Sequence, residues 1–511
     1  MPQETPREET SSEVIARLTE ELKQSRLENQ ALREKIDQLL KRLFGAQSEK
    51  LDPAQLQMLL KGIIEPPKSP EPVAAEEPRR STVPSPPRKP SQPRVPANTE
   101  VVEEILIPAE VQTRPQDWRC MGEEVTVQLD FEPGRFFKRR IVRRKYVRID
   151  APLSPPVIAP LQTLQDRCIA APGLIAAIIV GKYCDHLPLH RQQEILSTRY
   201  QVELPRQTMA QWLGLTAHWL QPIYDLIGKD VLAGGYVQVD ETPIEYLAPG
   251  HGSTRLGFLW VCKRPGGDAV FHWATSRGAE TLESIFPKSW KGTVQCDGYA
   301  AYPCFARKRQ QEGAIILCGC MAHARRPLYE ARESAPTVAG WLLRQIGHLY
   351  EIEEVLRRNR AGPRLREAER SARSAPILRR IHAALIRLRS RYLPQSGMGK
   401  AFAYILEQWP GLVRFAEDGR LEIDNNLVEN AIRPTAIGKK NWLFFGAADA
   451  GQRGAILYTI VESCRRRRID PYAYLRDVLT RLPKMQMKDV GKLTPEAWQM
   501  AQRAAQQRRA A

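Results

Sequence analysis

Two aspartates lie in similar surroundings, each at the end of a short strand-like segment. Asp240 ends the segment YVQVD and Asp297 ends TVQCD, and apolar and polar residues alternate in both. Such alternation predicts β-strands, with each carboxylate placed where a mostly apolar strand reaches the surface. Mg²⁺ prefers oxygen ligands, and two such ions about 3.5 to 4 Å apart can activate an attacking oxygen and neutralise the leaving oxygen of a phosphodiester. The pair therefore predicts a site for two Mg²⁺ or Mn²⁺ ions, with a third carboxylate from elsewhere in the chain.

The third carboxylate is expected in the segment EIDNNLVENAIRP, which offers Glu422, Asp424 and Glu429. Asp424 precedes two asparagines and a helical run, so its side chain is predicted to cap the helix by accepting a backbone N–H. Glu422 stands before that cap in a short extended piece, where its direction is poorly fixed. Glu429 lies inside the helix, which Pro434 is expected to limit, and the helix can hold it rigidly against the strand ends. Glu429 is therefore the predicted third ligand.

Several cations follow Glu429 at short intervals. Arg433 could pair with Glu429 or with the scissile phosphate, and Lys439 and Lys440 are expected to contact the DNA backbone. A lone carboxylate of this kind is more often a solvated turn or cap residue. The order of the three acids, and their expected places on two strands and a helix, favours a metal site here.

The strands that begin near Gly235 predict the fold that carries this site. Three strand segments, a helix at 280–286 and a fourth strand follow one another, which is the order of an α/β, ribonuclease H-like core. In that fold the first and fourth strands are neighbours, so their aspartates can share one ion. We expect the core at residues 231–332 and 421–485, interrupted by a helical insertion at 333–420. The arginine-rich helices of the insertion either track DNA or are simply solvated, and they are predicted at 341–358, 364–391 and 400–415.

Residues 12–44, within a segment at 10–45, show a heptad repeat. One seam position is held by Ile15, Leu22, Asn29, Ile36 and Leu43. This pattern predicts a coiled coil that joins chains into a homodimer or higher oligomer, with the lone asparagine fixing the register. The alternative is a single amphipathic helix packed on its own globule. Residues 64–100 are rich in proline and charge and predict a disordered, extended linker.

Residues 101–168 predict a small, basic, β-rich module. Apolar and polar residues alternate on both sides of a turn at Glu132 to Gly134, which is typical of a hairpin. The density of cations favours contact with DNA phosphates over a merely soluble strand surface. These cations are Arg135, Lys138, Arg139, Arg140, Arg143, Arg144, Lys145 and Arg148.

Residues 169–230 have the pattern of helices separated by short breaks. Between His190 and Leu213 two helices are predicted, with a turn at 202–204 and Pro205 opening the second. They fit a helix-turn-helix, which would place Arg206 and Gln207 near the start of a DNA-recognition helix. They fit an ordinary pair of packed helices equally well.

The composition favours a polyanion as partner. The chain of 511 residues carries a formal charge of +18, and a chain of this length is expected to contain several domains, ending in a basic tail at 486–511. We find no run of about 18 apolar residues and no signal peptide, so we expect no membrane association and a cytoplasmic protein. The nine scattered cysteines fit a reducing compartment.

Several motifs together resemble the insertion-sequence-66 family of transposases. They are VDETP, CDGYAAY, AHARR, DNNLVENAIRP and GKKNWLFFG, and the resemblance covers residues 10 to 485 or so. It implies an active site of Asp240, Asp297 and Glu429, a ribonuclease H-like core, and binding to the inverted-repeat ends of a mobile element. It also implies a bacterial, nucleoid-associated protein, with two small accessory proteins of the same element as partners.

Cysteine and histidine residues give a less decisive signal. Cys320 and His323 look like the Cys-x-x-His element that several such transposases carry near the scissile strand, but ordinary packing explains them equally well. A zinc site built from these two and Cys318 is less attractive, because the spacing is too short and no fourth ligand is evident. The family usually carries paired cysteines in the module before the helices, whereas this chain offers only Cys120 between Glu100 and Asp166. We therefore expect that module to fold without zinc.

The expected function is that of a DNA transposase. Metal-assisted hydrolysis at the transposon end would free a 3′ hydroxyl, which then attacks a target phosphodiester without a covalent enzyme intermediate. Another ribonuclease H-like nuclease, such as a junction resolvase, would share the carboxylates but lack the coiled coil, the linker and the end-binding modules. An inactive copy acting only as a DNA-binding regulator would bind DNA without divalent-metal-dependent nicking.

Overall fold

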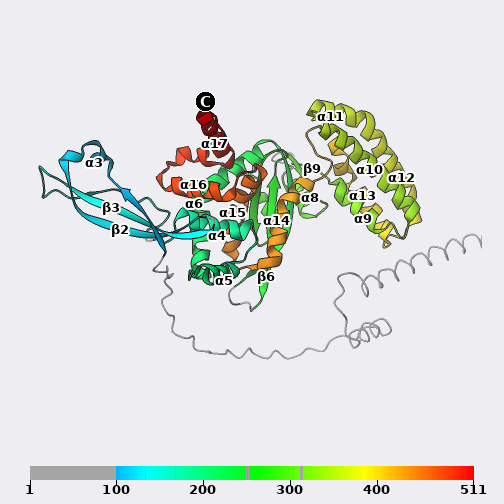
Figure 1. Cartoon of the computed structure of the whole chain (residues 1–511). Helices are drawn as coiled ribbons and strands as arrows, with labels where there is room; N and C mark the ends of the chain where they lie inside the picture. Colours follow the sequence, from blue (N-terminus) through cyan, green and yellow to red (C-terminus); the bar gives the residue numbers. More distant parts are fainter. Residues whose placement is uncertain are drawn as a thin grey trace, which may run out of the picture. The chain divides into compact units, whose positions relative to one another are not determined.

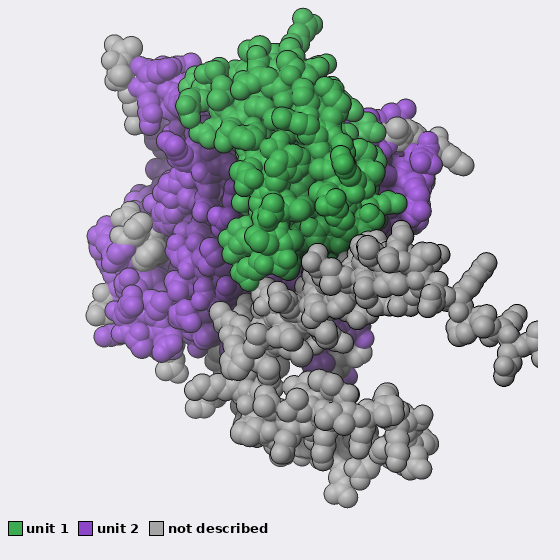
Figure 2. All heavy atoms as spheres, turned by 90° about the vertical axis from the view of Figure 1, so that its right-hand side faces the viewer, with its two compact units in different colours: residues 1–89, 321–423 green, residues 90–320, 424–511 purple. Residues whose placement is uncertain are grey.

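The computed structural model describes residues 99–132, 134–166, 168–248, 250, 252–310 and 315–510. The heptad segment 12–44 and nearly all of the proline-rich segment 64–100 lie outside these residues. The described chain falls into two compact units, which are coloured separately in Figure 2. Unit 1 contains Met321–Ile423, and unit 2 contains the described residues on both sides of it in the sequence. Within the described part of the chain, no helix is long and apolar enough to span a bilayer.

A mixed sheet forms the centre of unit 2 (Figure 1). Its strand order is β7 (Ala269–Ala274), β6 (Thr254–Lys263), β5 (Tyr236–Leu247), β8 (Gly292–Gln295) and β9 (Ile315–Cys318). The first three are antiparallel neighbours, whereas β8 and β9 run parallel to β5. The expected adjacency of the first and fourth strands is confirmed, because β5 pairs directly with β8. The sequence analysis missed β9, because a run of four residues is too short to show a period.

The first strand does not end at Asp240, and that prediction is wrong. β5 continues to Leu247 and stays paired with β6 throughout, up to the partner Thr254. Its far end also pairs with the short strand β10 (Phe444–Phe445). What does stop near Asp240 is the parallel ladder with β8, whose last pair is Gln238 with Gln295. The carboxylate emerges there because β5 loses one neighbour, although the strand itself goes on.

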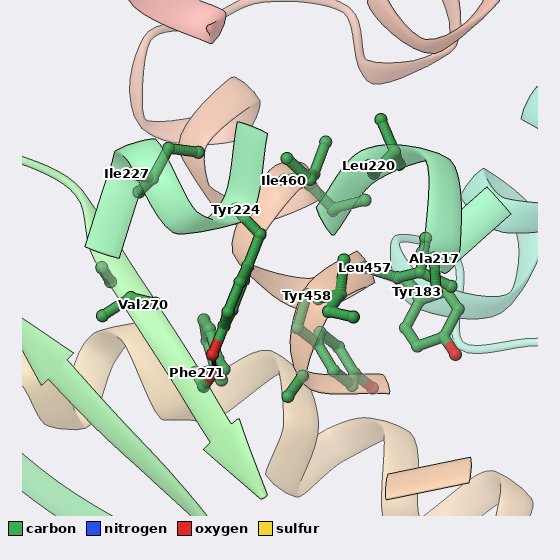
Figure 3. Packing of buried hydrophobic residues seen from close by; sticks show 14 of the residues in the cluster. Tyr183, Ala217, Leu220, Tyr224, Ile227, Val270, Phe271, Leu457, Tyr458 and Ile460 are labelled. Carbon is green, nitrogen blue, oxygen red and sulfur yellow. Dashed lines mark hydrogen bonds between the residues drawn. The ribbon is translucent and has the colours of Figure 1, made fainter. Parts of the chain in front are cut away.

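Helices α6 (Arg206–Ala233) and α15 (Ala448–Arg466) pack on β7 around a buried apolar cluster. Figure 3 shows Tyr224 of α6 reaching Phe271 of β7 close to Tyr458 of α15. The Tyr224 hydroxyl donates to the Phe271 carbonyl at 2.9 Å, and the rings of Phe271 and Tyr458 stack with centroids 5.7 Å apart. The Phe271 amide donates to Thr459 Oγ1 at 2.9 Å. Polar contacts therefore fix the register of both helices on the sheet, beyond what apolar burial alone would do.

The helix that carries Glu429 is α14 (Asn426–Trp442), and it packs on β5 and β6. Pro434 lies inside this helix, so the expectation that it limits the helix is wrong. An internal proline removes one backbone hydrogen bond, but packing on the sheet holds the following turns in place. Lys439, beyond the proline, donates through Nζ to Thr242 Oγ1 at 3.1 Å and to the Pro243 carbonyl at 3.0 Å.

The basic module near residue 100 is a separate small sheet of unit 2. Its strands are β1 (Glu100–Leu106), β2 (Trp118–Glu132), β3 (Arg135–Arg148) and β4 (Val157–Ile158), with β3 between β1 and β2. The predicted hairpin is confirmed, since β2 and β3 are antiparallel neighbours. Gly134 lies in the turn just before β3. Its φ of 99° is a left-handed conformation that glycine adopts without steric penalty.

Three helices connect this module to the central sheet. They are α4 (Pro172–Tyr183), α5 (Leu189–Tyr200) and α6, and the turn between the last two has Gln201 at φ 55°. The predicted helix pair is therefore present, with α6 beginning directly after Pro205. α6 runs far beyond Leu213, however, and its C-terminal half belongs to the core described above.

Unit 1 is helical, close to the predicted spans. Its helices are α9 (Met321–Glu330), α10 (Pro336–Arg358), α11 (Pro363–Glu369), α12 (Ala375–Leu388) and α13 (Gly397–Leu412). At its centre the fully buried Arg370 donates through Nε to Glu353 Oε1 at 2.6 Å and through Nη2 to Glu353 Oε2 at 2.7 Å. The same guanidinium donates to the carbonyls of Phe415 and Leu421. One cation thus ties α10 to the segment that leads out of the unit.

The C-terminal residues of unit 2 form α16 (Pro471–Arg481) and α17 (Pro495–Ala510). Trp498 of α17 donates through Nε1 to Asp477 Oδ2 at 2.8 Å and packs edge-on against the buried Tyr474. The segment expected to be a basic tail is therefore helical and its first turns are anchored to α16.

Candidate active site

Parallel pairing of β5 with β8 brings Asp240 and Asp297 to the same edge of the sheet. Gln238 and Gln295 are paired, and each aspartate lies two residues further along its own chain segment. Asp297 Oδ1 accepts the backbone N–H of Tyr299 at 3.0 Å, which orients its carboxylate. Both aspartates are half-buried.

The charges of the acids in this region act on one another. The pKa of Asp240 is raised to about 8, most of all by burial and then by the negative charges of Glu241, Glu429 and Asp297, in that order. Glu429 on α14 and Asp297 after β8 are therefore both within electrostatic range of Asp240. Like charges gathered in a half-buried site disfavour their own ionisation, and a divalent cation there would relieve that repulsion.

A buried network of amides holds the start of α14 against the two strands. Gln238 Nε2 donates to Gln295 Oε1 at 2.9 Å and to the Asp424 carbonyl at 2.9 Å. The Tyr236 hydroxyl donates to the same Gln295 oxygen at 2.6 Å, and Gln295 Nε2 donates to the Gly319 carbonyl at 3.1 Å. Because Asp424 lies two residues before the first residue of α14, this network fixes where the helix begins relative to both aspartates.

Asp424 and Glu422, the two other acids near Glu429 in the sequence, have partners of their own. Asp424 Oδ1 accepts the backbone N–H of Asn426 at 3.2 Å, and its Oδ2 accepts Asn426 Nδ2 at 2.8 Å. Asp424 therefore accepts a backbone N–H as predicted, but the N-cap position itself is held by Asn425, without a side-chain cap hydrogen bond. Glu422 belongs to unit 1, where it pairs with Arg357 at 3.2 Å and with Arg366 at 3.0 Å. The expectation that its direction is poorly fixed is therefore wrong, since two guanidinium groups orient it.

Glu241 is a fourth acid, next to Asp240 in the sequence, and was not among the predicted site residues. Its side chain is only 2% exposed and pairs with Arg277, whose Nη2 lies 2.6 Å from Glu241 Oε1. The Tyr302 hydroxyl donates to Oε2 at 2.8 Å. Burial raises the pKa of Glu241, while the hydrogen bonds from Tyr302 and Arg277 lower it. The motif VDETP contains this residue, but nothing local indicates its partners, which lie on distant elements.

The predicted accessory residues lie on different elements. The sulfur of the buried Cys320 accepts the backbone N–H of Asn425 at 3.5 Å, next to the start of α14. His323 lies on α9 in unit 1. Arg433 is exposed on α14, one turn after Glu429.

Many of the arginines predicted to bind DNA are engaged in ion pairs within the basic module. Their acidic partners come from the neighbouring strands β1 and β2, because the register places glutamates opposite β3. The prediction of DNA contact rested on these cations alone and did not consider the acids that face them. The pairs are Arg139 with Glu104, Arg140 with Glu103 at 2.7 Å, Arg143 with Glu124 at 2.9 Å and Arg144 with Glu123 at 3.5 Å.

The remaining residues of the predicted DNA-binding set differ in exposure. Lys145 is half-buried on β3, whereas Arg206 and Gln207 are exposed at the start of α6. Lys440 is exposed near the end of α14. Lys439 is turned toward β5, and burial together with the charge of Lys440 lowers its pKa. Lys440 is therefore better placed than Lys439 to reach a phosphate.

Comparison with known proteins identifies the family. Residues 167–453 match the description Transposase IS66 family, residues 459–495 match the IS66 C-terminal element, and residues 31–103 match Transposase C of IS166 homeodomain. The chain is similar to uncharacterized protein y4jD of Sinorhizobium fredii, with 33% identity over 71% of this chain and 72% of that protein. It is also 35% identical to uncharacterized protein y4qI of the same organism, over 71% of this chain and 68% of that protein. The chain belongs to the IS66 family of transposases.

Proposed function

We propose that this chain is the catalytic subunit of its transposon and that Asp240, Asp297 and Glu429 hold two Mg²⁺ or Mn²⁺ ions. The observation that carries the proposal is the buried amide network, in which Gln238 bonds both to Gln295, two residues before Asp297, and to the carbonyl of Asp424, near the start of the Glu429 helix. The charges of Glu429 and Asp297 also raise the pKa of Asp240. Carboxylates offer hard oxygen ligands, which suit these cations. Glu422 and Asp424, the competing acids, already have guanidinium and backbone partners.

We propose that the sheet of unit 2 is a ribonuclease H-like core. Three antiparallel strands followed by two parallel ones, in the order β7, β6, β5, β8, β9, support this assignment. The helix that carries Glu429 packs on the central strands, after the long interruption by unit 1. The core therefore receives its third acid from a distant part of the sequence.

The reaction we propose is hydrolysis at the transposon end, followed by in-line attack of the freed 3′ hydroxyl on target DNA. When bound, the two ions would activate the attacking oxygen and neutralise the leaving oxygen. Asp240 and Asp297 hold their carboxylates at one sheet edge because the β5–β8 pairing fixes them. The amide network of Gln238 and Gln295 keeps the Glu429 helix in place, so no rearrangement of the strands is needed during the reaction.

DNA binding outside the catalytic site is assigned to several regions. The net charge of +18, the exposed Arg206, Gln207 and Lys440, and the homeodomain description matched at 31–103 support binding to transposon ends and target. We further propose that residues 12–44 join chains into a dimer or higher oligomer, and that two small accessory proteins of the element take part.

The decisive experiment compares Asp240→Asn and Asp297→Asn with the wild-type chain on a plasmid carrying the element's ends. We expect both variants to lose Mg²⁺- and Mn²⁺-dependent cleavage while still shifting end DNA in a gel, because each removes ligand charge and no DNA contact. Asp225→Asn serves as control, since Asp225 lies on α6 and accepts from Gln221 at 2.7 Å. Cleavage by either catalytic-site variant at more than a small residual rate would reject the assignment. A wild-type chain that binds the ends but never nicks them would indicate a regulator.

A further inference from the structure

Glu241 is a fourth carboxylate within electrostatic range of Asp240 and Asp297. Its charge is the strongest of the neighbouring charges that raise the pKa of Asp240, ahead of those of Glu429 and Asp297. Chemically it is as good a magnesium ligand as the other three. Both of its oxygens, however, already accept hydrogen bonds, Oε1 from Arg277 Nε at 2.8 Å and Oε2 from the Tyr302 hydroxyl at 2.8 Å.

Arg277 is held in place from two sides. It lies in the turn between β7 and α7 (Ala279–Ile285), where Ser276 Oγ accepts the Gly278 amide at 3.0 Å and the Ser276 carbonyl accepts Thr281 Oγ1 at 3.1 Å. Its guanidinium also stacks on Tyr299, 3.7 Å from the ring centroid. A planar guanidinium clamped between a carboxylate and an aromatic ring has little freedom to turn away.

The same contacts reach the second aspartate. The backbone N–H of Tyr299, the residue under Arg277, donates to Asp297 Oδ1 at 3.0 Å. Tyr302, whose hydroxyl holds the other Glu241 oxygen, is 1% exposed and lies on α8 (Ala301–Lys308), just after Tyr299. Arg277, Tyr299 and Tyr302 therefore form one support that touches both Glu241 and Asp297.

We propose that Arg277 is a positioning residue that withholds Glu241 from the metal ions, leaving three carboxylates as ligands. This inference rests on the proposed function of the site. Mg²⁺ binds few carboxylates and keeps waters in the remaining positions of its octahedron. A fourth carboxylate would take a position that the attacking water or the phosphate needs, so tighter metal binding would go with slower cleavage. Arg277 also balances the charge of Glu241, so the local net charge set by this pair is zero.

The test is a double-variant cycle in the full-length chain, using Arg277→Gln, Glu241→Gln and the two combined. Mn²⁺ affinity is measured by calorimetry without DNA, and cleavage is measured on the plasmid with transposon ends. We expect Arg277→Gln to bind Mn²⁺ about tenfold more tightly and to cleave at least about tenfold more slowly, because Glu241 is freed as a ligand. We expect the double variant to return to wild-type Mn²⁺ affinity and to cleave about tenfold faster than Arg277→Gln.

The matched control is Arg264→Gln. Arg264 pairs with Asp230 at 2.7 Å and its side chain is 32% exposed, against 41% for Arg277. Its partner Asp230 lies on α6, which carries none of the proposed ligands, so the loss of Arg264 is expected to leave both readouts unchanged. If Arg277→Gln fails to fold, Arg277→Lys replaces it, with wild-type Mn²⁺ affinity and partial cleavage expected because the charge on Glu241 is still matched.

Three results would overturn the inference. Unchanged Mn²⁺ affinity in Arg277→Gln would mean that Glu241 is not released as a ligand. In Arg277→Lys, a cleavage loss as complete as that of Asp240→Asn would mean that the guanidinium itself is required, whatever happens to Glu241. A double variant as slow as Arg277→Gln alone would mean that Arg277 acts directly on the phosphate. Failure of the proposed function is distinguished from all three, because it would appear as normal cleavage by Asp240→Asn.

Discussion

Gln238 and Gln295 are the last pair of the parallel β5–β8 ladder, and their side chains are joined by a 2.9 Å hydrogen bond. Each stands two residues before a proposed catalytic aspartate. Gln238 also donates to the carbonyl of Asp424, which precedes the helix of Glu429. One buried pair of amides is thus connected to all three elements that carry the proposed ligands.

Replacing Gln238 with methionine should therefore weaken both stability and cleavage. The change keeps the shape of the side chain but leaves the Asp424 carbonyl and Gln295 Oε1 without this donor, at a cost of about 1 to 3 kcal/mol in the free energy of unfolding. Chemical denaturation and the plasmid assay measure the two effects. Gln221→Met, at an exposed position of α6, is the control and should change stability by no more than about 0.5 kcal/mol. Wild-type cleavage by Gln238→Met would show that the network does not position Glu429.

The choice of Glu429 over its neighbours predicts the outcome of three substitutions. Glu429→Gln should be as inactive as the two aspartate variants, because it removes a ligand charge. Asp424→Asn should keep measurable cleavage, since asparagine is also a good helix cap. Glu422→Gln should keep cleavage too, because its partners Arg357 and Arg366 lie in unit 1. Normal cleavage by Glu429→Gln together with an inactive Asp424 or Glu422 variant would contradict the assignment.

The raised pKa of Asp240 predicts how the stability of the metal-free protein depends on pH. The pKa rises from 3.8 to about 8 on folding, so between these values the folded chain holds a proton that the unfolded chain has lost. Stability contributed by this group is therefore present below pH 4 or so and declines as the pH rises towards 8. Thermal unfolding from pH 5 to pH 8 in EDTA should show a steeper decline for the wild type than for Asp240→Asn. Equal slopes would mean that Asp240 is ionised throughout.

The buried pair of Arg370 and Glu353 makes unit 1 sensitive to a single substitution. Arg370→Met leaves a carboxylate buried, and breaking such a pair typically costs about 3 to 5 kcal/mol. The double variant Arg370→Met with Glu353→Leu should be less destabilised than the single one, because no uncompensated charge remains. Arg373→Met is the control, since its pair with Glu369 is solvent-exposed. A single variant as stable as wild type, measured by urea unfolding, would show that Arg366 alone can neutralise Glu353.

The sequence by itself determined the features that depend on the spacing of apolar and polar residues within one segment of the chain. Alternation around Asp240 and Asp297 was enough to predict two strands, and the spacing of apolar residues was enough to predict the helices of unit 1 within a few residues. That Asp424 accepts a backbone N–H at the start of α14 was also predictable, because the donor, Asn426, is only two residues away. Each of these follows from interactions between residues that are close in the chain.

Tertiary structure decided which distant residues meet. No local pattern links Glu241 to Arg277, or Glu422 to Arg357, because these pairs form only after β7 and α10 have packed into place. Packing likewise overrode local signals, since β5 continues past Asp240 through its pairing with β6, and α14 continues past Pro434 on the sheet. The energy of such contacts depends on the assembled fold, so the sequence period that predicts each element carries no information about its partner.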